Sequence, residues 1–165
     1  MNNVVIGGRT DRAGDDEPWV YYETVGGGQG GRPGKAGMSG VHTAMTNTRD
    51  TPVEALERAL PIRVLRYALR RGSGGAGAYP GGDGIERELE LLEPATVSLV
   101  TERRVSRPWG LDGGEPGSPG ENWLLPEGDA HRARRLPDKC TVELAAGDVI
   151  RLLTPGGGGF GVSPG

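Results

Sequence analysis

Alternating hydrophobic and polar residues predict several short β-strands in this chain. Residues 19–25 are rich in aromatic and β-branched side chains, which favour strands. In residues 85–92 glutamates alternate with leucines, as expected for a strand with one exposed and one buried face. Residues 97–103 alternate in a similar way, and residues 141–144 and 149–153 are joined by a turn sequence typical of a hairpin. We therefore expect antiparallel strands to dominate the fold.

One short helix is predicted near residues 52–60. Thr51 can act as the N-cap, and Pro52 suits the first position of a helix. Glu54 would complete a capping box with Thr51. Pro61 interrupts the pattern, so the helix should end just before it.

Residues 62–70 fit two kinds of structure. Helical spacing continues through Val64 and Tyr67, which would lie on one face. Alternation through Leu65, Tyr67 and Leu69 fits a strand equally well. We favour the strand, because the preceding proline resets the period and a glycine-rich turn follows.

The remaining segments are predicted to be loops. Residues 9–18 are charged and turn-rich, which indicates an exposed loop. Residues 106–137 are punctuated by proline and glycine, and five large side chains are candidates for buried anchors. These anchors are Trp109, Leu111, Trp123, Leu124 and Leu125. The predicted fold class is mainly β (β-rich α+β), with antiparallel strands, long glycine-rich loops and one short capped helix in a single domain, residues 1–165.

Glycine is unusually frequent and is clustered. The 165 residues include 31 glycines and 13 prolines, a level that can indicate disorder. Four consecutive glycines lie in the tail, residues 154–161, and ordering them costs much backbone entropy. Either these segments are disordered, or their backbone runs where no Cβ fits. We expect ordered loops, because strand patterns flank the clusters and a net charge of −3 gives little self-repulsion.

Composition excludes several classes of function. Acidic residues slightly outnumber basic ones, which argues against nucleic-acid binding. No apolar run approaches the roughly 20 residues of a membrane-spanning helix, and no signal peptide is visible. The single cysteine, Cys140, excludes an internal disulfide. A cytoplasmic location is therefore expected.

Few residues carry an obvious chemical motif. No glycine cluster matches a phosphate-binding loop, and a G-x-G-x-x-G spacing at residues 26–31 is not followed by a helix. The two histidines, His42 and His131, and Cys140 lack the spacing of a zinc site, so no metal site is expected. Residues 40–49 combine an imidazole, hydroxyl and amide groups and an arginine, which could orient a polar substrate. The alternative for this segment is a polar connection that leads to the helix cap.

The motifs together resemble a known family. They occur in one order along essentially the whole chain: Asn2-Asn3, Tyr21-Tyr22-Glu23-Thr24, Gly40-Val41-His42-Thr43, Met45-Thr46-Asn47-Thr48-Arg49, Thr51-Pro52-Val53-Glu54, the glycine runs within residues 72–84, Pro108-Trp109-Gly110-Leu111, and Gly147-Asp148 leading to the glycine-rich tail. This order resembles the C-terminal part of the hydantoinase B/oxoprolinase family, about the last third of a typical member. Relatives include N-methylhydantoinase B-type subunits, 5-oxoprolinase and acetone or acetophenone carboxylase subunits.

The resemblance implies ATP-dependent hydrolysis of cyclic amides such as hydantoins and 5-oxoproline. It implies two partners, namely the upstream half of the same subunit and a hydantoinase A-type ATPase subunit that performs the phosphorylation. ATP and a divalent metal are implied for the assembled enzyme, with no cofactor expected in this chain. The chain would then shape the substrate pocket and the subunit interface of a hetero-oligomer, and would not be active alone.

The site residues expected from the resemblance lie in two segments. His42 is the candidate catalytic residue, and Asn3, Thr46 and Asn47 are candidates for substrate binding. Ala44 stands where members often have a second histidine, which would remove one imidazole from the site. Two alternatives stay open: a non-catalytic interaction domain or remnant of a split gene, and a subunit of a related ATP-dependent ketone carboxylase.

Overall fold

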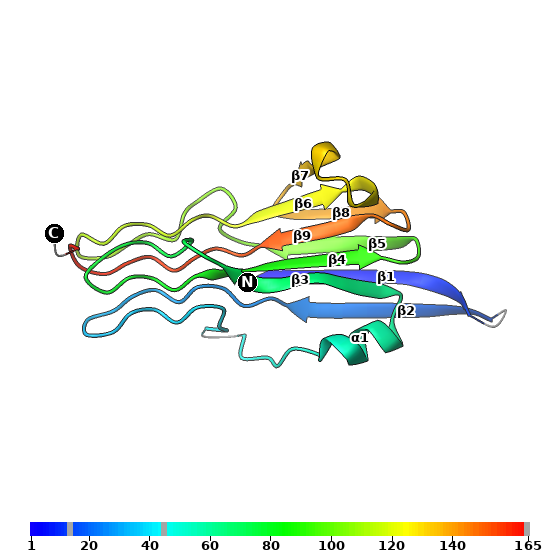
Figure 1. Cartoon of the computed structure of the whole chain (residues 1–165), viewed down its shortest axis with the longest axis horizontal. Coiled ribbons are helices and arrows are strands. Elements are labelled where there is room, and N and C mark those ends of the chain that lie inside the picture. The colour runs from blue at the N-terminus through cyan, green and yellow to red at the C-terminus, as the bar shows by residue number, and fades with distance from the viewer. Residues whose placement is uncertain (13–14, 44–45, 164–165) are drawn as a thin grey trace.

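The strands form two antiparallel sheets in the computed structural model, which describes residues 1–12, 15–43 and 46–163. The first sheet has the strand order β2-β1-β5-β8, and the second sheet has the order β3-β4-β9-β6-β7 (Figure 1). The first sheet contains β1 (Asn2–Arg12), β2 (Asp15–Thr24), β5 (Ala95–Thr101) and β8 (Lys139–Leu144). The second contains β3 (Ile62–Arg70), β4 (Gly84–Leu91), β9 (Val149–Leu153), β6 (Glu121–Leu125) and β7 (Arg134–Leu136). The helical elements are α1 (Val53–Ala59) and two single turns, η1 (Pro126–Gly128) and η2 (Ala130–Arg132).

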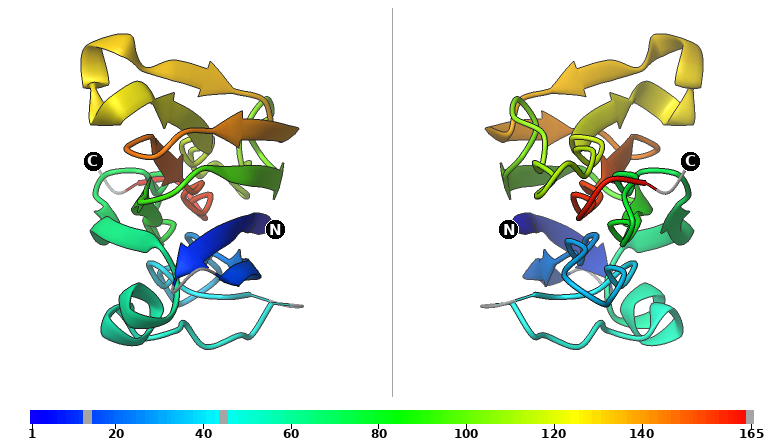
Figure 2. Two further views of the ribbon diagram at one scale, coloured as in Figure 1. Left: turned by 90° about the vertical axis from the view of Figure 1, so that its right-hand side faces the viewer. Right: turned by 90° about the vertical axis from the view of Figure 1, so that its left-hand side faces the viewer.

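Hydrophobic side chains from both sheets meet in one core, so the sheets form a sandwich (Figure 2). Alternation along each strand turns one set of side chains inward, and burial of each large aliphatic side chain contributes about 1.5–3 kcal/mol. The inward set includes Val4, Ile6, Val97 and Leu99 from the first sheet and Ile62, Leu89, Ile150 and Leu152 from the second. The predicted β-rich fold with antiparallel strands and one short helix is confirmed.

The outer face of the second sheet is charged and paired. The glutamates of β4 point away from the core, as their alternation with leucine predicts, and each meets an arginine of a neighbouring strand. The pairs are Arg66 with Glu86 at 2.5 Å, Arg151 with Glu88 at 2.5 Å, and Arg63 with Glu90 at 3.0 Å. Residues 62–70 therefore form a strand, as favoured from the sequence, and their arginines complete this ion-pair ladder.

Beyond one end of the sandwich, four glycine-rich segments run side by side (Figure 1). They have no regular strand ladder and are held together by backbone hydrogen bonds between segments. We call these segments the glycine bundle. It comprises residues 26–41, 72–84, 108–120 and 154–161.

The last of these segments lies at the centre of the glycine bundle. Three consecutive carbonyl groups of this segment accept hydrogen bonds from the three other segments in turn. The bonds are Gly75 N–H to Gly157 at 2.8 Å, Gly31 N–H to Gly158 at 2.8 Å, and Leu111 N–H to Gly159 at 2.9 Å. A repeat of three residues per turn is that of a polyproline II-type helix, whose backbone groups all point outward to neighbours.

Steric contacts show why these positions are glycine. A Cβ on Gly156, Gly157, Gly158 or Gly159 would lie within 2.0 Å of a carbonyl oxygen on an adjacent segment. The oxygens belong in turn to Ser73, Gln29, Trp109 and Ala76. The first and the fourth lie in the same segment, residues 72–84, so the contacted segment again repeats after three residues. No side chain could retreat to make room, because every obstructing atom is backbone. The glycines thus lie in close-packed segments, in agreement with the expectation of order.

Two local expectations were wrong. Residues 9–12 belong to β1 and residues 15–18 to β2, because backbone pairing such as that of Arg9 with Pro18 continues the ladder through polar sequence. The helix begins at Val53 with Pro52 as the N-cap and without a side-chain capping bond. Pro52 is extended, with a ψ of 137°, so the helix starts one residue later than a Thr51 cap requires.

The expected buried anchors are only partly buried. Leu124 and Leu125 are buried, whereas Trp109 is 63% exposed and Leu111 is 55% exposed. These two belong to the glycine bundle, whose interior has no space for side chains. The Trp109 ring instead lies on the bundle surface, 4.2 Å from the guanidinium of Arg103.

Candidate functional site

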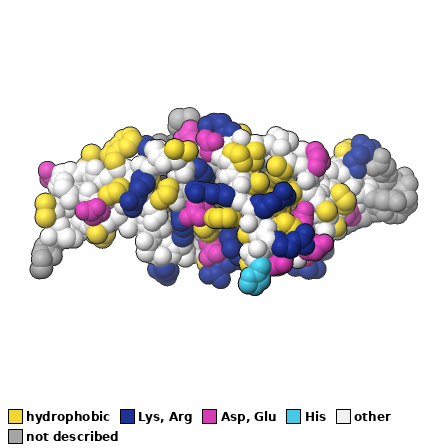
Figure 3. All heavy atoms as spheres, turned by 90° about the horizontal axis from the view of Figure 1, so that it is seen from above, with side chains coloured by type: hydrophobic (Ala, Val, Ile, Leu, Met, Phe, Trp, Pro, Cys, Tyr) yellow, Lys and Arg dark blue, Asp and Glu magenta, His cyan; other side chains and the backbone are white. Residues whose placement is uncertain are grey.

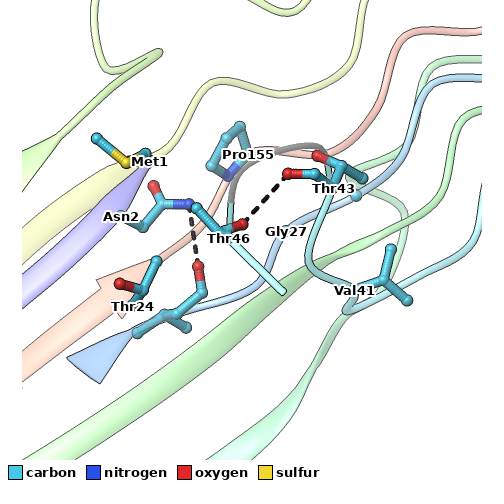
Figure 4. A pocket seen from close by; sticks show the side chains of 10 residues that line it. Met1, Asn2, Thr24, Gly27, Val41, Thr43, Thr46 and Pro155 are labelled. Atoms are coloured by element: carbon cyan, nitrogen blue, oxygen red, sulfur yellow. Dashed lines mark hydrogen bonds between the residues drawn. The ribbon is translucent and has the colours of Figure 1, made fainter. Parts of the chain in front are cut away.

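A hollow of about 270 Å³ lies where the first sheet meets the glycine bundle (Figure 4). It is formed by the ends of β1 and β2, the start of the tail and the segment after Gly40, so residues far apart in the sequence meet here. Ten of the residues that the structure describes line it: Met1, Asn2, Thr24, Val25, Gly27, Gly28, Val41, Thr43, Thr46 and Pro155. None of them is an Asp, Glu, His, Lys or Arg, so the lining side chains offer hydroxyl, amide and apolar surface.

Asn2 is the most firmly held polar group of the hollow. It follows the inward alternation of Val4 and Ile6 and therefore lies at the end of the core row. Its Nδ2 donates to the carbonyl of Val25 at 3.3 Å, and its Oδ1 accepts from Arg104 Nη1 at 2.5 Å. These bonds fix which end of the amide faces each neighbour.

Arg104 anchors Asn2 from behind the hollow. Its side chain is buried, and Nε and Nη2 donate to Asn122 Oδ1 at 3.1 and 2.8 Å. Burial lowers the pKa of Arg104 to about 10, so it still carries its charge at neutral pH. Gly120 makes this position possible, because a Cβ there would lie 2.5 Å from Arg104 Nη1.

The hydroxyl groups of Thr24, Thr43 and Thr46 form the rest of the polar wall. The Thr24 hydroxyl donates to Asn3 Oδ1 at 3.0 Å, and Tyr22 OH lies 3.1 Å from the same hydroxyl. Thr46 Oγ1 donates to the carbonyl of Thr43 at 3.3 Å (Figure 4). The wall can therefore donate and accept hydrogen bonds without placing a net charge in the hollow.

A buried ion pair lies beside this wall, between the two sheets. Arg87 Nη2 is 3.1 Å from Glu23 Oε2, and both side chains are almost fully buried. Tyr21 OH donates to the same oxygen at 2.7 Å. Burial raises the pKa of the Tyr21 phenol and the negative charge of Glu23 raises it further, so Tyr21 stays protonated and acts as a donor. Breaking such a pair leaves an uncompensated charge, so it fixes the sheets relative to each other.

The structure separates the four predicted site residues. Thr46 lines the hollow, and Asn3 contacts its wall through Thr24. His42 lies between two lining residues but does not itself line the hollow, and its Nδ1 is buried without a partner among the described residues. Asn47 is exposed and lies outside the lining. Ala44, the predicted departure from the family pattern, lies outside the described residues.

Sequence reasoning missed Asn2 and Arg104. The alternation of Asn2, Val4 and Ile6 was a usable signal, because it places the amide on the core face. No local signal marks Arg104, whose role depends on a contact with a residue about 100 positions earlier.

Metal-ligating side chains do not cluster in the part of the chain that the structure describes. The residues that the structure describes contain no group of three or more His, Cys, Asp or Glu side chains able to hold one. Within the same residues, no helix has the length and apolar character needed to cross a membrane. Cys140 is a free thiol, and burial raises its pKa.

Comparison with known proteins places the chain in a family. Residues 1–163 match the family model described as Hydantoinase B/oxoprolinase. The chain is 46% identical to 5-oxoprolinase 1 of Arabidopsis thaliana over 161 residues, which cover 98% of this chain and 12% of that protein. It is 37% identical to a putative D-/L-hydantoinase B-type subunit of Pseudomonas sp. over 144 residues, which cover 87% of this chain and 24% of the relative.

A solved structure agrees with this placement at the level of fold. The ATP-dependent caprolactamase from Pseudomonas jessenii superposes with a TM-score of 0.78 at 24% identity, over 98% of this chain and 29% of that one. The chain thus spans a quarter or less of the two curated relatives. The match over nearly all its residues means that this protein belongs to the hydantoinase B/oxoprolinase family.

Proposed function

We propose that this chain is the C-terminal portion of a subunit of an ATP-dependent cyclic-amide hydrolase of the hydantoinase/5-oxoprolinase type. Its role is to shape the substrate pocket and the interface between subunits. The similarity to proteins named as a 5-oxoprolinase and as a hydantoinase of the B type supports this reaction class. In keeping with a supply of ATP, we expect it to act in the cytoplasm.

The observation that carries the proposal is that the described side chains lining the hollow are uncharged. A cyclic amide presents one N–H donor and one carbonyl acceptor on a ring whose other edge is apolar. The hydroxyls of Thr43 and Thr46 can satisfy the amide edge, and Val25 and Val41 offer apolar surface to the ring. In this proposal the hollow binds and orients the ring.

His42 is proposed as the acid/base of this region. A neutral imidazole can donate and accept hydrogen bonds at once, and Nδ1 has no partner among the described residues. Its neighbours Val41 and Thr43 line the hollow, so a small shift of this segment would bring the ring to the substrate.

ATP and a divalent metal do not fit the residues of the hollow. Phosphate and Mg²⁺ sites use glycine-rich phosphate loops and carboxylates, whereas the ten lining residues include no carboxylate. We therefore assign both to the partners, namely the upstream half of the same subunit and a hydantoinase A-type ATPase. This chain's own residues bind and orient substrate.

A chimera tests the proposal. In it the matching region of Arabidopsis thaliana 5-oxoprolinase 1 is replaced by residues 1–165, and a second protein lacks that region altogether. We expect phosphate release that depends on 5-oxoproline or hydantoin from the chimera, and none from the deletion protein or from the isolated chain. A chimera that melts like its parent but does not turn over would contradict the proposal.

A non-catalytic interaction domain or remnant of a split gene is the second candidate function. An inactive but folded chimera would favour it. Activity with acetone and bicarbonate in place of cyclic amides would instead favour the ketone carboxylase branch of the family.

His42→Ala in the active chimera separates a catalytic from a structural histidine. Loss of an acid/base typically lowers the rate by about 10²–10⁴-fold. We expect such a loss with a nearly unchanged melting temperature. A lower melting temperature with an unchanged rate per folded molecule would make His42 a structural residue.

A further inference from the structure

An apolar groove opens along one edge of the sandwich, away from the hollow. It has a volume of about 360 Å³ and lies between β7 and β8. Four aliphatic side chains contribute to it, of which Leu124 and Leu144 are buried while Leu136 and Val142 are partly exposed. The interior of the sandwich is therefore accessible from this edge.

The groove is open because both strands are outermost in their sheets. β8 pairs only with β5, and β7 pairs only with β6, among the strands that the structure describes, yet the two are consecutive in the chain. Only Pro137 and Asp138 connect them, so the strands leave one corner and belong to different sheets. Outermost strands present unpaired N–H and C=O groups to which another strand can add.

The rim of the groove carries two positive charges and one negative charge. Glu143 of β8 also lines it, and its carboxylate accepts hydrogen bonds from the Thr96 hydroxyl at 2.8 and 2.9 Å. Arg134 and Arg135 are exposed and line the groove, and neither forms an ion pair with a described residue. By contrast, the arginines on the outer face of the second sheet are paired with glutamates. Figure 3 looks onto this side of the molecule, where basic, acidic and hydrophobic side chains are intermingled. The two unpaired charges favour an acidic occupant.

We propose that the β7–β8 groove binds an extended segment from the upstream region of the hydantoinase B-type subunit, which adds as a strand to β8. Apolar side chains at alternate positions would enter between Leu136 and Val142, and acidic side chains would meet Arg134 and Arg135. Two observations point to this occupant. Arg134 and Arg135 have no ion-pair partner among the described residues, and in the Arabidopsis thaliana and Pseudomonas sp. relatives the matching region makes up only 12% and 24% of the protein, so most of each relative lies outside it. This inference rests on the proposed function, because it takes that upstream region as the partner.

Binding in trans tests the inference. The probe is Arabidopsis thaliana 5-oxoprolinase 1 from which the matching region has been removed, titrated with residues 1–165 in a calorimeter. Leu136→Glu and the double variant Arg134→Glu/Arg135→Glu should each weaken binding by about tenfold or more. The matched controls are Leu65→Glu, an exposed leucine of β3, and Arg32→Glu/Lys35→Glu, two exposed basic residues of the glycine bundle; both should bind like wild type.

Each outcome decides the inference. Loss of binding by the groove variants alone supports it, provided that their melting temperatures match those of the controls. Wild-type affinity in both groove variants, or no binding by the wild-type chain, overturns it. A homodimer that Leu136→Glu dissociates would assign the groove to a second copy and also overturn it. The proposed function is judged separately, by turnover of the covalent chimera.

Discussion

The sandwich and the glycine bundle reach a close-packed structure by opposite means. In the sandwich, side chains such as Leu89 and Leu152 fill the space between two sheets. In the bundle, backbone lies directly against backbone, and positions such as Gly157 exclude any side chain. The difference shows that a region with almost no buried hydrophobic side chains can still be specified sterically, because only glycine permits the contact.

The largest effect is expected from Gly157→Ala. The new Cβ would lie 2.0 Å from the carbonyl oxygen of Gln29, and the obstructing backbone cannot rotate away. Overpacking usually costs about 1–3 kcal/mol, and here we expect at least about 4 kcal/mol, because no side chain can yield. Denaturant unfolding measures the loss.

Gly30→Ala is the matched control for that variant. Gly30 lies in the same bundle, but its added Cβ would approach nothing closer than 3.7 Å. Such a replacement changes stability by less than about 1 kcal/mol. Equal effects of the two substitutions would refute the steric account of the bundle.

A smaller loss, about 3 kcal/mol, is expected from Leu152→Ala in the sandwich. Leu152 is fully buried between the sheets, and removal of its side chain leaves a cavity. Hydrogen exchange should show faster exchange throughout the sandwich, whereas Gly157→Ala should mainly expose bundle amides such as that of Gly75. Identical exchange patterns for both variants would mean that the two regions unfold as one unit.

The smallest effect is expected on the charged outer face. Arg66 is half exposed and pairs with Glu86, so Arg66→Ala should cost less than about 1 kcal/mol. Raising the salt concentration should reduce the difference from wild type further. A cost that is larger and independent of salt would show that this face is covered rather than solvated.

The contrast between side-chain packing in the sandwich and backbone packing in the bundle also explains what could be predicted from the sequence. The strands at residues 85–92 and 149–153 were predictable, because burial of one sheet face imposes alternation on the side chains. For the bundle, the sequence predicted ordered glycine segments but not how they pair. The segments pair through backbone groups, which impose no periodic pattern of side chains on the sequence. The strand pairing of residues 9–12 with residues 15–18 was missed for a related reason, because polar residues are paired there through the backbone.

For the candidate site, local chemistry indicated residues 40–49, part of which lines the hollow, but it did not indicate Asn2 or Arg104. Thr46 was found because residues 40–49 concentrate polar groups, and it lines the hollow. Asn47, one position away, has the same kind of chemistry but is exposed. Arg104 could not be found locally, because its contact with Asn2 joins segments that only the fold brings together.

The central claim is that the hollow between the first sheet and the glycine bundle binds the cyclic amide. The most direct test compares Thr46→Val with Asn47→Ala in the active chimera, measuring kcat/KM and melting temperature. Loss of one hydrogen bond from Thr46 should lower kcat/KM by about three- to tenfold without changing the melting temperature. Asn47→Ala should behave like the parent chimera. Full activity of Thr46→Val, or a loss confined to Asn47→Ala, would contradict the claim.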